Sequence, residues 1–300
     1  MNEFYYVLIK KDGTIVHNIF ATSHRDLIDK YLTPDEIKDE SFFMAVYSPK
    51  EGHRLDDVDN YVLMNSGMYY PAWFVGEFKE QVMLDLKAII GSMIVRGRKK
   101  LLLHEGIIMT NTTIVEEAKH SIIFAMYDNS KIIRLDNTSE VREMTDNVVV
   151  EQMRDGSKVT EMWGYSEVVE MHDYSKIMKM FGQSKVGTML DHARIAVLKG
   201  DSNVLEMHDK AQADRLKHMS RVTEMHGHSV IEEMWDWTVV EKMFDNARIN
   251  FMDDEAKVLE MYDDTMVDQM FGSSIVEKLT QNSLVRKLNE KAQILKKELE

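Results

Sequence analysis

Rings, histidines and carboxylates are the residues of this 300-residue sequence whose type and spacing could do chemistry. Many of the rings directly follow a Met or Leu, at positions that differ by multiples of nine. They are Tyr127, Trp163, His172, Phe181, His208, His226, Trp235, Phe244, Tyr262 and Phe271. Carboxylates gather further along the chain, at Asp253, Asp254, Glu255, Glu260, Asp263, Asp264 and Asp268. A line of rings can bind a protein or a sugar, and a row of carboxylates can meet a basic surface.

The histidines raise the question of a metal site. His208 and His226 are 18 residues apart, and a repeating fold would bring them together. Imidazole is a common zinc ligand, but the spacing fixes no third ligand, so we expect neither a metal nor another cofactor. The sequence has no cysteine, no His-Glu-x-x-His segment and no phosphate-binding glycine loop. We therefore predict no catalytic residues.

We predict a protein-binding surface instead. Its residues are Trp163, Phe181, Trp235 and Phe271 for the rings and Asp254, Asp263 and Asp264 for the carboxylates. The competing interpretation is structural: rings can shield the corners of a coil, and exposed charges keep rods from pairing edge to edge. The choice between them depends on the fold that positions these side chains.

A nine-residue repeat must position them. Met or Leu stands at every ninth residue from 126 to 279, eighteen times in all, and fourteen of these anchors are Met. A Val or Ile precedes the anchor by three residues in every repeat except the one with Ala213. Two residues earlier stands a small residue, usually Ser, and two residues after the anchor stands mostly Asp or Gly. Such regularity is the signature of a repeat architecture.

A strand and a turn fit this period, whereas a helix does not. Nine residues make about two and a half helical turns, so successive repeats would face opposite sides. Small and β-branched residues two apart share one face of a strand, and Asp or Gly suits the corner. We predict a parallel β-solenoid in which the chain bends between the β-branched residue and the anchor, so that both enter one core. Two or three repeats per coil fit the period; we favour two, which would make Trp163 and Phe181 neighbours on one edge.

The small-x-aliphatic pattern, as in Ser157-Lys158-Val159 and Ser202-Asn203-Val204, resembles that of pentapeptide-repeat proteins, which form β-helices. The repeat length is similar to that of calcium-binding nonapeptide β-rolls, but their Gly-Gly-x-Gly-x-Asp loop is absent. Some pentapeptide-repeat proteins imitate duplex DNA, and the resemblance implies DNA mimicry here by analogy alone.

The predicted fold class is mainly β, with a distinct segment at each end of the solenoid. Residues 1–105 lack the repeat and read as an α+β domain, with a hairpin at Asp12-Gly13 and a long helix over 73–95 that ends in a basic cluster, Arg96, Arg98, Lys99 and Lys100. Residues 106–120 form a connection with a degenerate first repeat, and 121–279 form the solenoid. Residues 280–300, with an apolar stripe at Leu284, Leu288, Ala292, Leu295 and Leu299, predict an amphipathic helix that either caps the last coil or forms a homo-oligomer.

Composition and net charge limit the classes of partner that we expect this protein to bind. The net charge is −14, and residues 121–279 hold 30 Asp and Glu against 18 Lys and Arg. This balance disfavours direct binding of nucleic acid and favours a protein partner with a basic surface. No segment predicts secretion or membrane insertion, so we expect a cytoplasmic protein. The first hypothesis is a non-enzymatic binding protein, at its most specific an acidic nucleic-acid mimic that inhibits a nucleic-acid-binding protein. The alternatives are an acyltransferase-like enzyme with its site between protomers and a self-assembling or glycan-binding element.

Overall fold

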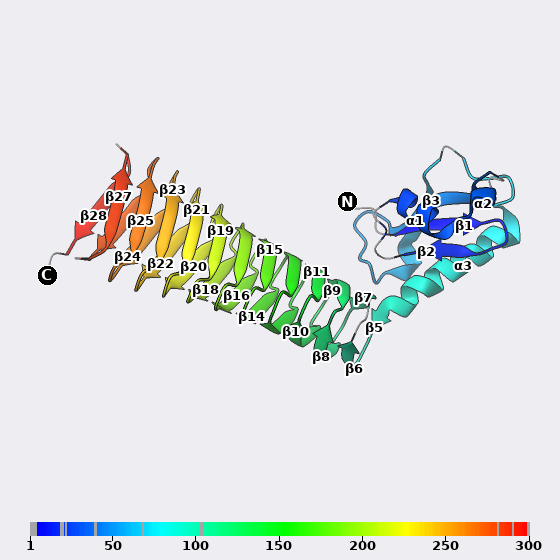
Figure 1. Cartoon of the computed structure of the whole chain (residues 1–300), viewed down its shortest axis with the longest axis horizontal. Coiled ribbons are helices and arrows are strands. Elements are labelled where there is room, and N and C mark those ends of the chain that lie inside the picture. The colour runs from blue at the N-terminus through cyan, green and yellow to red at the C-terminus, as the bar shows by residue number, and fades with distance from the viewer. Residues whose placement is uncertain are drawn as a thin grey trace. The chain divides into compact units, whose positions relative to one another are not determined.

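The computed structural model describes residues 5–18, 21, 23–38, 41–67, 69–102, 105–280, 282–289 and 291–298. Phe4 and Phe20, on either side of the predicted hairpin, and Gln281, Glu290, Leu299 and Glu300, in the predicted C-terminal helix, lie outside this part of the chain. The chain divides into two compact units, Met1–Val95 and Arg96–Glu300 (Figure 1). The division falls before the predicted boundary at residue 105.

The N-terminal unit contains a four-stranded antiparallel sheet and helices. Its elements are β1 (Tyr6–Lys10), β2 (Ile15–His17), α1 (His24–Tyr31), α2 (Pro34–Lys38), β3 (Phe42–Pro49), the 3-10 turn η1 (Val58–Asn60), β4 (Tyr61–Asn65), α3 (Gly76–Met93) and β5 (Ile94–Val95). The sheet order is β2-β1-β3-β4. The predicted hairpin turns at Gly13, whose φ of 92° suits glycine. Ser23 begins α1 through a capping box with Asp26.

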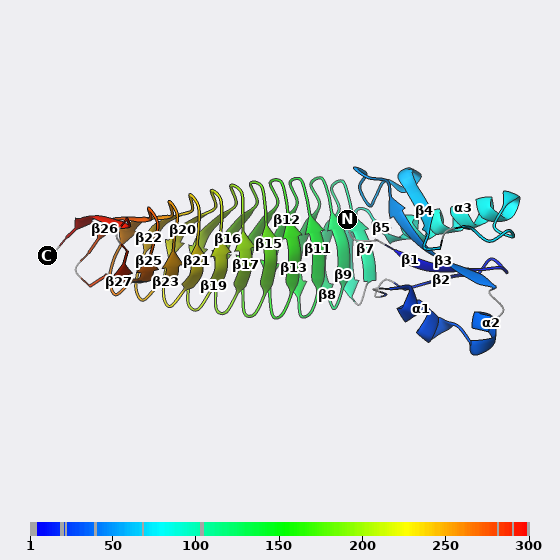
Figure 2. The ribbon, with the colours of Figure 1, turned by 90° about the horizontal axis from the view of Figure 1, so that it is seen from above.

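The second unit is a parallel β-solenoid with two strands in each coil (Figures 1 and 2). One sheet consists of β6 (Arg98–Leu102), β8 (Ile114–Lys119), β10 (Lys131–Asp136), β12 (Val149–Met153), β14 (Glu167–Met171), β16 (Lys185–Met189), β18 (Asn203–Met207), β20 (Arg221–Met225), β22 (Val239–Met243), β24 (Lys257–Met261), β26 (Ile275–Leu279) and β28 (Gln293–Lys297).

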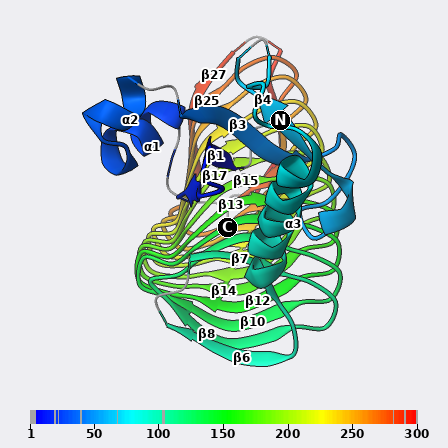
Figure 3. The same ribbon diagram turned by 90° about the vertical axis from the view of Figure 1, so that its right-hand side faces the viewer.

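The facing sheet contains β7 (Glu105–Met109), β9 (Ile122–Met126), β11 (Glu140–Met144), β13 (Lys158–Met162), β15 (Lys176–Met180), β17 (Arg194–Leu198), β19 (Gln212–Leu216), β21 (Val230–Met234), β23 (Arg248–Met252), β25 (Met266–Met270) and β27 (Leu284–Leu288). Paired residues are 18 apart, as in Met162 with Met180, so the favoured count of two repeats per coil is confirmed. Seen from the end, successive coils are rotated relative to one another (Figure 3).

The core of the solenoid is built from the three columns of the repeat. Ser175, Ile177 and Met180 are all fully buried, while the two residues between Ile177 and Met180 are exposed. The two residues equivalent to Ile177 and Met180 are also buried in every strand from β9 to β26, so the predicted bend within the strand is confirmed for these coils. Burying one such Met contributes about 1.5–3 kcal/mol, and Met fills the narrow interior because its side chain is flexible.

The first coil corrects the interpretation of the basic cluster. Helix α3 ends at Met93, Gly97 takes a φ of 77°, and Arg98–Leu102 is strand β6 rather than the end of a helix. Strand β6 pairs with β8 through a register shift, in which Arg98 lies opposite Ile114. This irregularity explains why the nine-residue period is not visible there.

The predicted C-terminal helix is wrong. Residues Leu284–Leu288 and Gln293–Lys297 form β27 and β28, the last strands of the two sheets. Val285 lies opposite Val267, so the pairing continues with the same 18-residue offset. The apolar residues fit a helical stripe, but strand pairing with the preceding coil decides the conformation. Capping or oligomerisation through a helix therefore has no basis. Within the described residues, no helix is long and apolar enough to cross a membrane.

Candidate binding edge of the solenoid

The turns between strands form two rows along the solenoid, one at each edge (Figure 2). We call the row that follows the odd-numbered strands, with Trp163, Phe181, Trp235 and Phe271, the aromatic edge. The row that follows the even-numbered strands, with His172, His208 and His226, is the histidine edge. The residue after each anchor occupies the first turn position, and the next two occupy the second and third.

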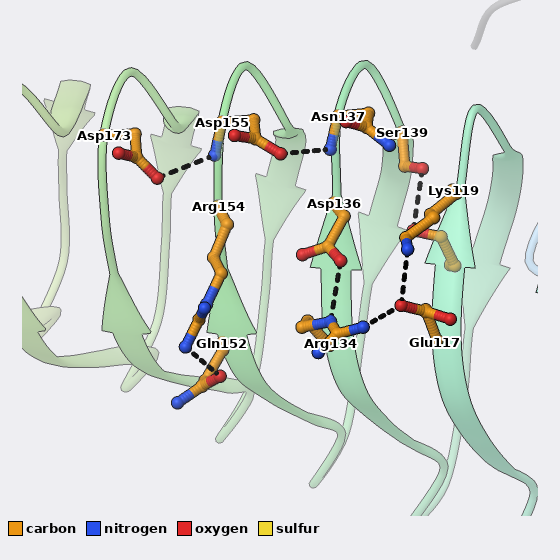
Figure 4. Close-up of polar contacts among 11 residues, drawn as sticks. Glu117, Lys119, Arg134, Asp136, Asn137, Ser139, Gln152, Arg154, Asp155 and Asp173 are labelled. Carbon is orange, nitrogen blue, oxygen red and sulfur yellow. Dashed lines mark hydrogen bonds and ion pairs between the residues drawn. The ribbon is translucent and has the colours of Figure 1, made fainter.

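The second turn position explains the Asp and Gly column of the sequence. Its residues have left-handed backbone, with φ of 56° at Asp173 and 65° at Gly164. Asp tolerates this conformation better than most residues with a Cβ, and Gly has no Cβ. Each Asp also accepts a hydrogen bond from the second-position amide of the preceding coil: Asp173 Oδ2 lies 3.1 Å from the Asp155 nitrogen, and Asp155 Oδ2 lies 3.2 Å from the Asn137 nitrogen (Figure 4). We call this row of bonds the carboxylate ladder.

The aromatic edge brings the four predicted rings onto one line. Trp163 and Phe181 stack with centroids 4.0 Å apart, as expected for neighbouring coils. Trp235 and Phe271 are two coils apart, and Phe251 on β23 lies between them, 5.0 Å from Trp235 and 5.3 Å from Phe271.

Two lysines occupy the coils between these ring pairs. Lys199 Nζ lies 6.0 Å from the Phe181 ring, and Lys217 Nζ lies 5.7 Å from the Trp235 ring. A lysine so placed makes a cation–π contact with its neighbour. Rings and ammonium groups therefore cover much of one another's faces, which supports the structural interpretation for the first turn position.

A carboxylate holds most first-position rings in place. Trp163 Nε1 donates to Glu161 over 3.3 Å and Trp235 Nε1 donates to Glu233 over 3.1 Å. On the histidine edge, His172 Nε2 lies 3.1 Å from Glu170. The hydrogen bond with His172 lowers the pKa of the Glu170 carboxyl below its ordinary value of 4.5. The sequence carries the signal six times, as Glu-Met followed by Trp, His or Tyr.

The histidine edge is a continuous stack over four coils. His208, His226, Phe244 and Tyr262 follow one another with centroid separations of 4.7, 4.8 and 5.1 Å. His208 and His226 are neighbours, as predicted, and their nearest carboxylates are Glu206 at 3.0 Å and Glu224 at 3.2 Å. Among the described residues, no group of three His, Cys, Asp or Glu side chains could hold a metal ion.

The predicted carboxylates do not share one surface. Asp254 occupies the second turn position of the aromatic edge, where its Oδ2 accepts from the Asp236 amide at 3.4 Å. Asp263 occupies the equivalent position of the histidine edge and accepts from the Asp245 amide at 3.1 Å. Asp264 follows it on that edge and is exposed. Alternate repeats turn at alternate edges, so residues nine apart in the sequence are separated by the width of the coil.

The third turn position holds binding candidates that the sequence prediction missed. On the aromatic edge, Tyr165, Met219 and Trp237 are 65%, 60% and 62% exposed, more than Trp163 at 40%. Met219 and Trp237 are 18 residues apart and therefore occupy neighbouring coils. The sequence held one signal, since Trp235 and Trp237 stand two residues apart. The third turn position was missed because its residue type varies from one repeat to the next.

Charged groups buried in the first coils pair with one another. Glu117 is 5% exposed and contacts Arg134 and Lys119, and Arg134 also donates to Asp136 over 2.7 Å (Figure 4). The buried charges compensate one another, and removal of one partner would leave the other unpaired in the interior. A groove of about 610 Å³ lies in the N-terminal unit, lined by both Lys87 and its ion-pair partner Asp59.

Comparisons with known proteins identify no relative, so the chain is assigned to a class of protein from its structure. No protein-family model matches the sequence, and neither the curated proteins nor the solved structures include a match. The coils themselves show that the chain is a β-solenoid repeat protein with an 18-residue spacing between stacked strands.

Proposed function

We propose that the solenoid is a non-enzymatic binding protein that holds a protein partner with a basic surface along its aromatic edge. One observation carries the proposal. Between β19 and β25 this edge combines the exposed Met219 and Trp237 with three successive carboxylates, Asp253, Asp254 and Glu255. Apolar anchors beside carboxylates are what an interface for arginine-bearing segments requires.

The chemistry of the edge suits arginine in particular. A guanidinium can stack on an indole ring and bind a carboxylate with two parallel hydrogen bonds. Trp237 is the most exposed of the four tryptophans, at 62% against 40% for Trp163. Glu255 occupies the next third position along the same edge and has no ion pair among the described residues. The excess of acidic residues over 121–279 would attract such a partner from a distance.

Charge reversal on the two edges tests the proposal. Glu255 and Asp264 both occupy exposed third turn positions, lie outside the carboxylate ladder and face different edges. The measurement is affinity capture from the native cell with the wild type, Glu255→Lys and Asp264→Lys as baits. We expect one basic protein to be captured by the wild type and by Asp264→Lys but at least tenfold less by Glu255→Lys, since a buried charge contact is worth about 2 kcal/mol or more. Equal capture by all three baits would contradict the proposal.

Removal of the ring gives a second matched pair. Trp237 and Tyr174 are 62% and 63% exposed and occupy third positions of opposite edges. Trp237→Ala should weaken binding of the captured partner by about 2 kcal/mol, as truncation of an interface anchor does. Tyr174→Ala should leave the affinity unchanged. Isothermal titration calorimetry with the purified partner measures both, and a larger loss for Tyr174→Ala would place the partner on the histidine edge.

Mimicry of a nucleic acid is the second candidate, and a different observation favours it. On the histidine edge, the carboxylates of Asp155, Asp173, Asp191 and Asp209 follow one another in successive coils. Neighbouring coils are about 4.8 Å apart, so the row is a regular line of negative charge along a rigid support. In this version the partner binds nucleic acid, and a DNA or RNA duplex should displace the solenoid from it. Simultaneous binding of duplex and solenoid would exclude mimicry.

A further inference from the structure

The carboxylate ladder shows which ligand the second-position amides bind. Ten of these amides donate to the Asp carboxylate one coil further on, at 2.8–3.4 Å. The bond recurs on both edges and with Asp, Asn, Gly or His as the donor residue. A left-handed turn thus directs its amide toward the next coil, where a carboxylate oxygen satisfies it.

The ladder is interrupted on the aromatic edge. Gly164, Gly182, Gly200 and His218 occupy the four successive positions where a carboxylate would accept from the amides of Asp146, Gly164, Gly182 and Gly200. In the part of the chain that the structure describes, the amides of the three glycines have no hydrogen-bond acceptor. A Cβ at Gly182 would lie 3.3 Å from the Gly164 nitrogen, and one at Gly200 would lie 3.1 Å from the Gly182 nitrogen. The empty space of the missing side chains therefore lies directly in front of the amides.

One further gap on the same edge shows what fills such a space. Gly272 offers no carboxylate to the amide of Asp254. The side chain of Asp253 takes that role, with Oδ1 2.7 Å from the Asp254 nitrogen. A carboxylate from a different position is thus recruited where the ladder residue is missing. At Gly164, Gly182 and Gly200 the preceding residues are Trp163, Phe181 and Lys199, so the chain supplies no carboxylate in this way.

Two lysines lie beside the interrupted segment of the carboxylate ladder. Lys199 and Lys217 occupy first turn positions beside Gly200 and His218. Their ammonium groups approach the rings of Phe181 and Trp235, and neither has an ion pair among the described residues.

We infer that this segment of the aromatic edge is a binding site for the carboxylates of an acidic peptide segment from another protein. The amides of Gly164, Gly182 and Gly200 donate to the bound carboxylates, as their equivalents donate to the ladder, and Lys199 and Lys217 supply the countercharge. At the Gly164 and Gly182 amides the bound carboxylate takes the place of a missing Asp side chain. This site does not depend on the proposed function, because its three amides lie in other turns and it selects the opposite charge, although Lys217 shares a turn with Met219.

Completing the ladder within the chain should close the site. Gly200→Asp supplies a carboxylate to the Gly182 amide, and Gly182→Asp supplies one to the Gly164 amide. Both substitutions restore the commonest residue of the column, so the double variant should fold, as thermal unfolding will show. Gly227→Asp is the matched control, since Gly227 interrupts the ladder at a single position of the histidine edge.

The measurement is a titration of the ¹⁵N-labelled full chain with a hexa-aspartate peptide, followed by NMR. We expect saturable shifts of the Gly164, Gly182 and Gly200 amide signals and none at Gly227. The double variant should bind at least tenfold more weakly, while Gly227→Asp should bind as the wild type does. Replacement of Lys199 and Lys217 by Gln should weaken binding about tenfold and reduce its salt dependence.

Three results would overturn the inference. The first is the absence of shifts at the three glycines, and the second is equal binding by the double variant and the wild type. The third concerns the source of the oxyanion: inorganic phosphate is titrated in parallel, and shifts caused by phosphate but not by hexa-aspartate would show that the site does not select peptide carboxylates.

Discussion

Asp191 shows how one residue type serves both the backbone and the stacking of coils. It has a φ of 55°, accepts a hydrogen bond from the Asp173 amide and donates its own amide to Asp209. The Asp column is therefore explained by structure before any partner is considered. Carboxylates that lie outside the ladder, such as Glu255, are the better candidates for binding because the fold does not need them.

The ladder predicts different effects for two substitutions of Asp191. Asp191→Ala removes the acceptor and leaves a Cβ in left-handed backbone without side-chain compensation, so it should lower the free energy of unfolding by about 2 kcal/mol. Asp191→Asn keeps an acceptor oxygen and should change stability by less than about 1 kcal/mol. Chemical denaturation measures both. Equal losses for Ala and Asn would show that the ladder bond contributes nothing.

The Glu-Met-ring motif predicts a pH effect at Glu170. Its pKa is lowered below 4.5 by the hydrogen bond with His172, so the bond stabilises the fold at pH values above 4.5 and this stabilisation disappears as the pH falls through the lowered pKa. His172→Phe, which places at this position a residue found at other first turn positions, should move the pKa of Glu170 back toward 4.5. A ¹³C NMR titration of the carboxyl group measures the change, and an unchanged pKa would rule out the histidine as its cause.

At the scale of elements, the repeat predicted strands, bends and coils, and the same reasoning failed where two patterns overlap. Leu284, Leu288 and Leu295 fit a helical stripe, yet Ser283, Val285 and Leu288 also continue the nine-residue columns. The local spacing of apolar residues cannot distinguish a helix from a strand in this segment. Pairing with β25 and β26 decides for strands, because the last coil of a solenoid adopts the conformation that its neighbour can hydrogen-bond.

Close packing between neighbouring strands predicts a contrast between two glycines. A Cβ at Gly187 on β16 would lie 2.4 Å from the Val169 carbonyl oxygen on β14, so the strands could not keep their spacing. Gly187→Ala should lower the free energy of unfolding by about 1–3 kcal/mol, as overpacking does.

Gly156 is the matched control for this substitution. A Cβ there would meet only the Asn137 carbonyl oxygen at 3.7 Å, an ordinary contact. Gly156→Ala should therefore be neutral or stabilise by about 0.5 kcal/mol. Urea denaturation of both variants tests the comparison, and a tolerated Gly187→Ala would mean that β14 and β16 can move apart locally.

At the scale of the whole molecule, the coil determines which residues can act together. An 18-residue coil places Trp163 beside Phe181, and the sequence sufficed to predict this. The same rule separates Asp254 from Asp263 and Asp264, because an odd number of repeats lies between them. What the sequence could not reveal was exposure. Trp163 stacks on Phe181 and is 40% exposed, whereas Trp237 is 62% exposed, and stacking depends on the neighbours in three dimensions.

The aromatic edge, with its acidic segment beside Trp237 and its open amides at Gly164, Gly182 and Gly200, is the surface on which the account depends. Hydrogen–deuterium exchange of the full chain with and without its captured basic partner tests this most directly. We predict slower exchange on binding in the turns 235–237 and 253–255, with no change in the histidine-edge turns 226–228 and 262–264. Protection confined to the histidine edge, or to the N-terminal unit, would contradict the account.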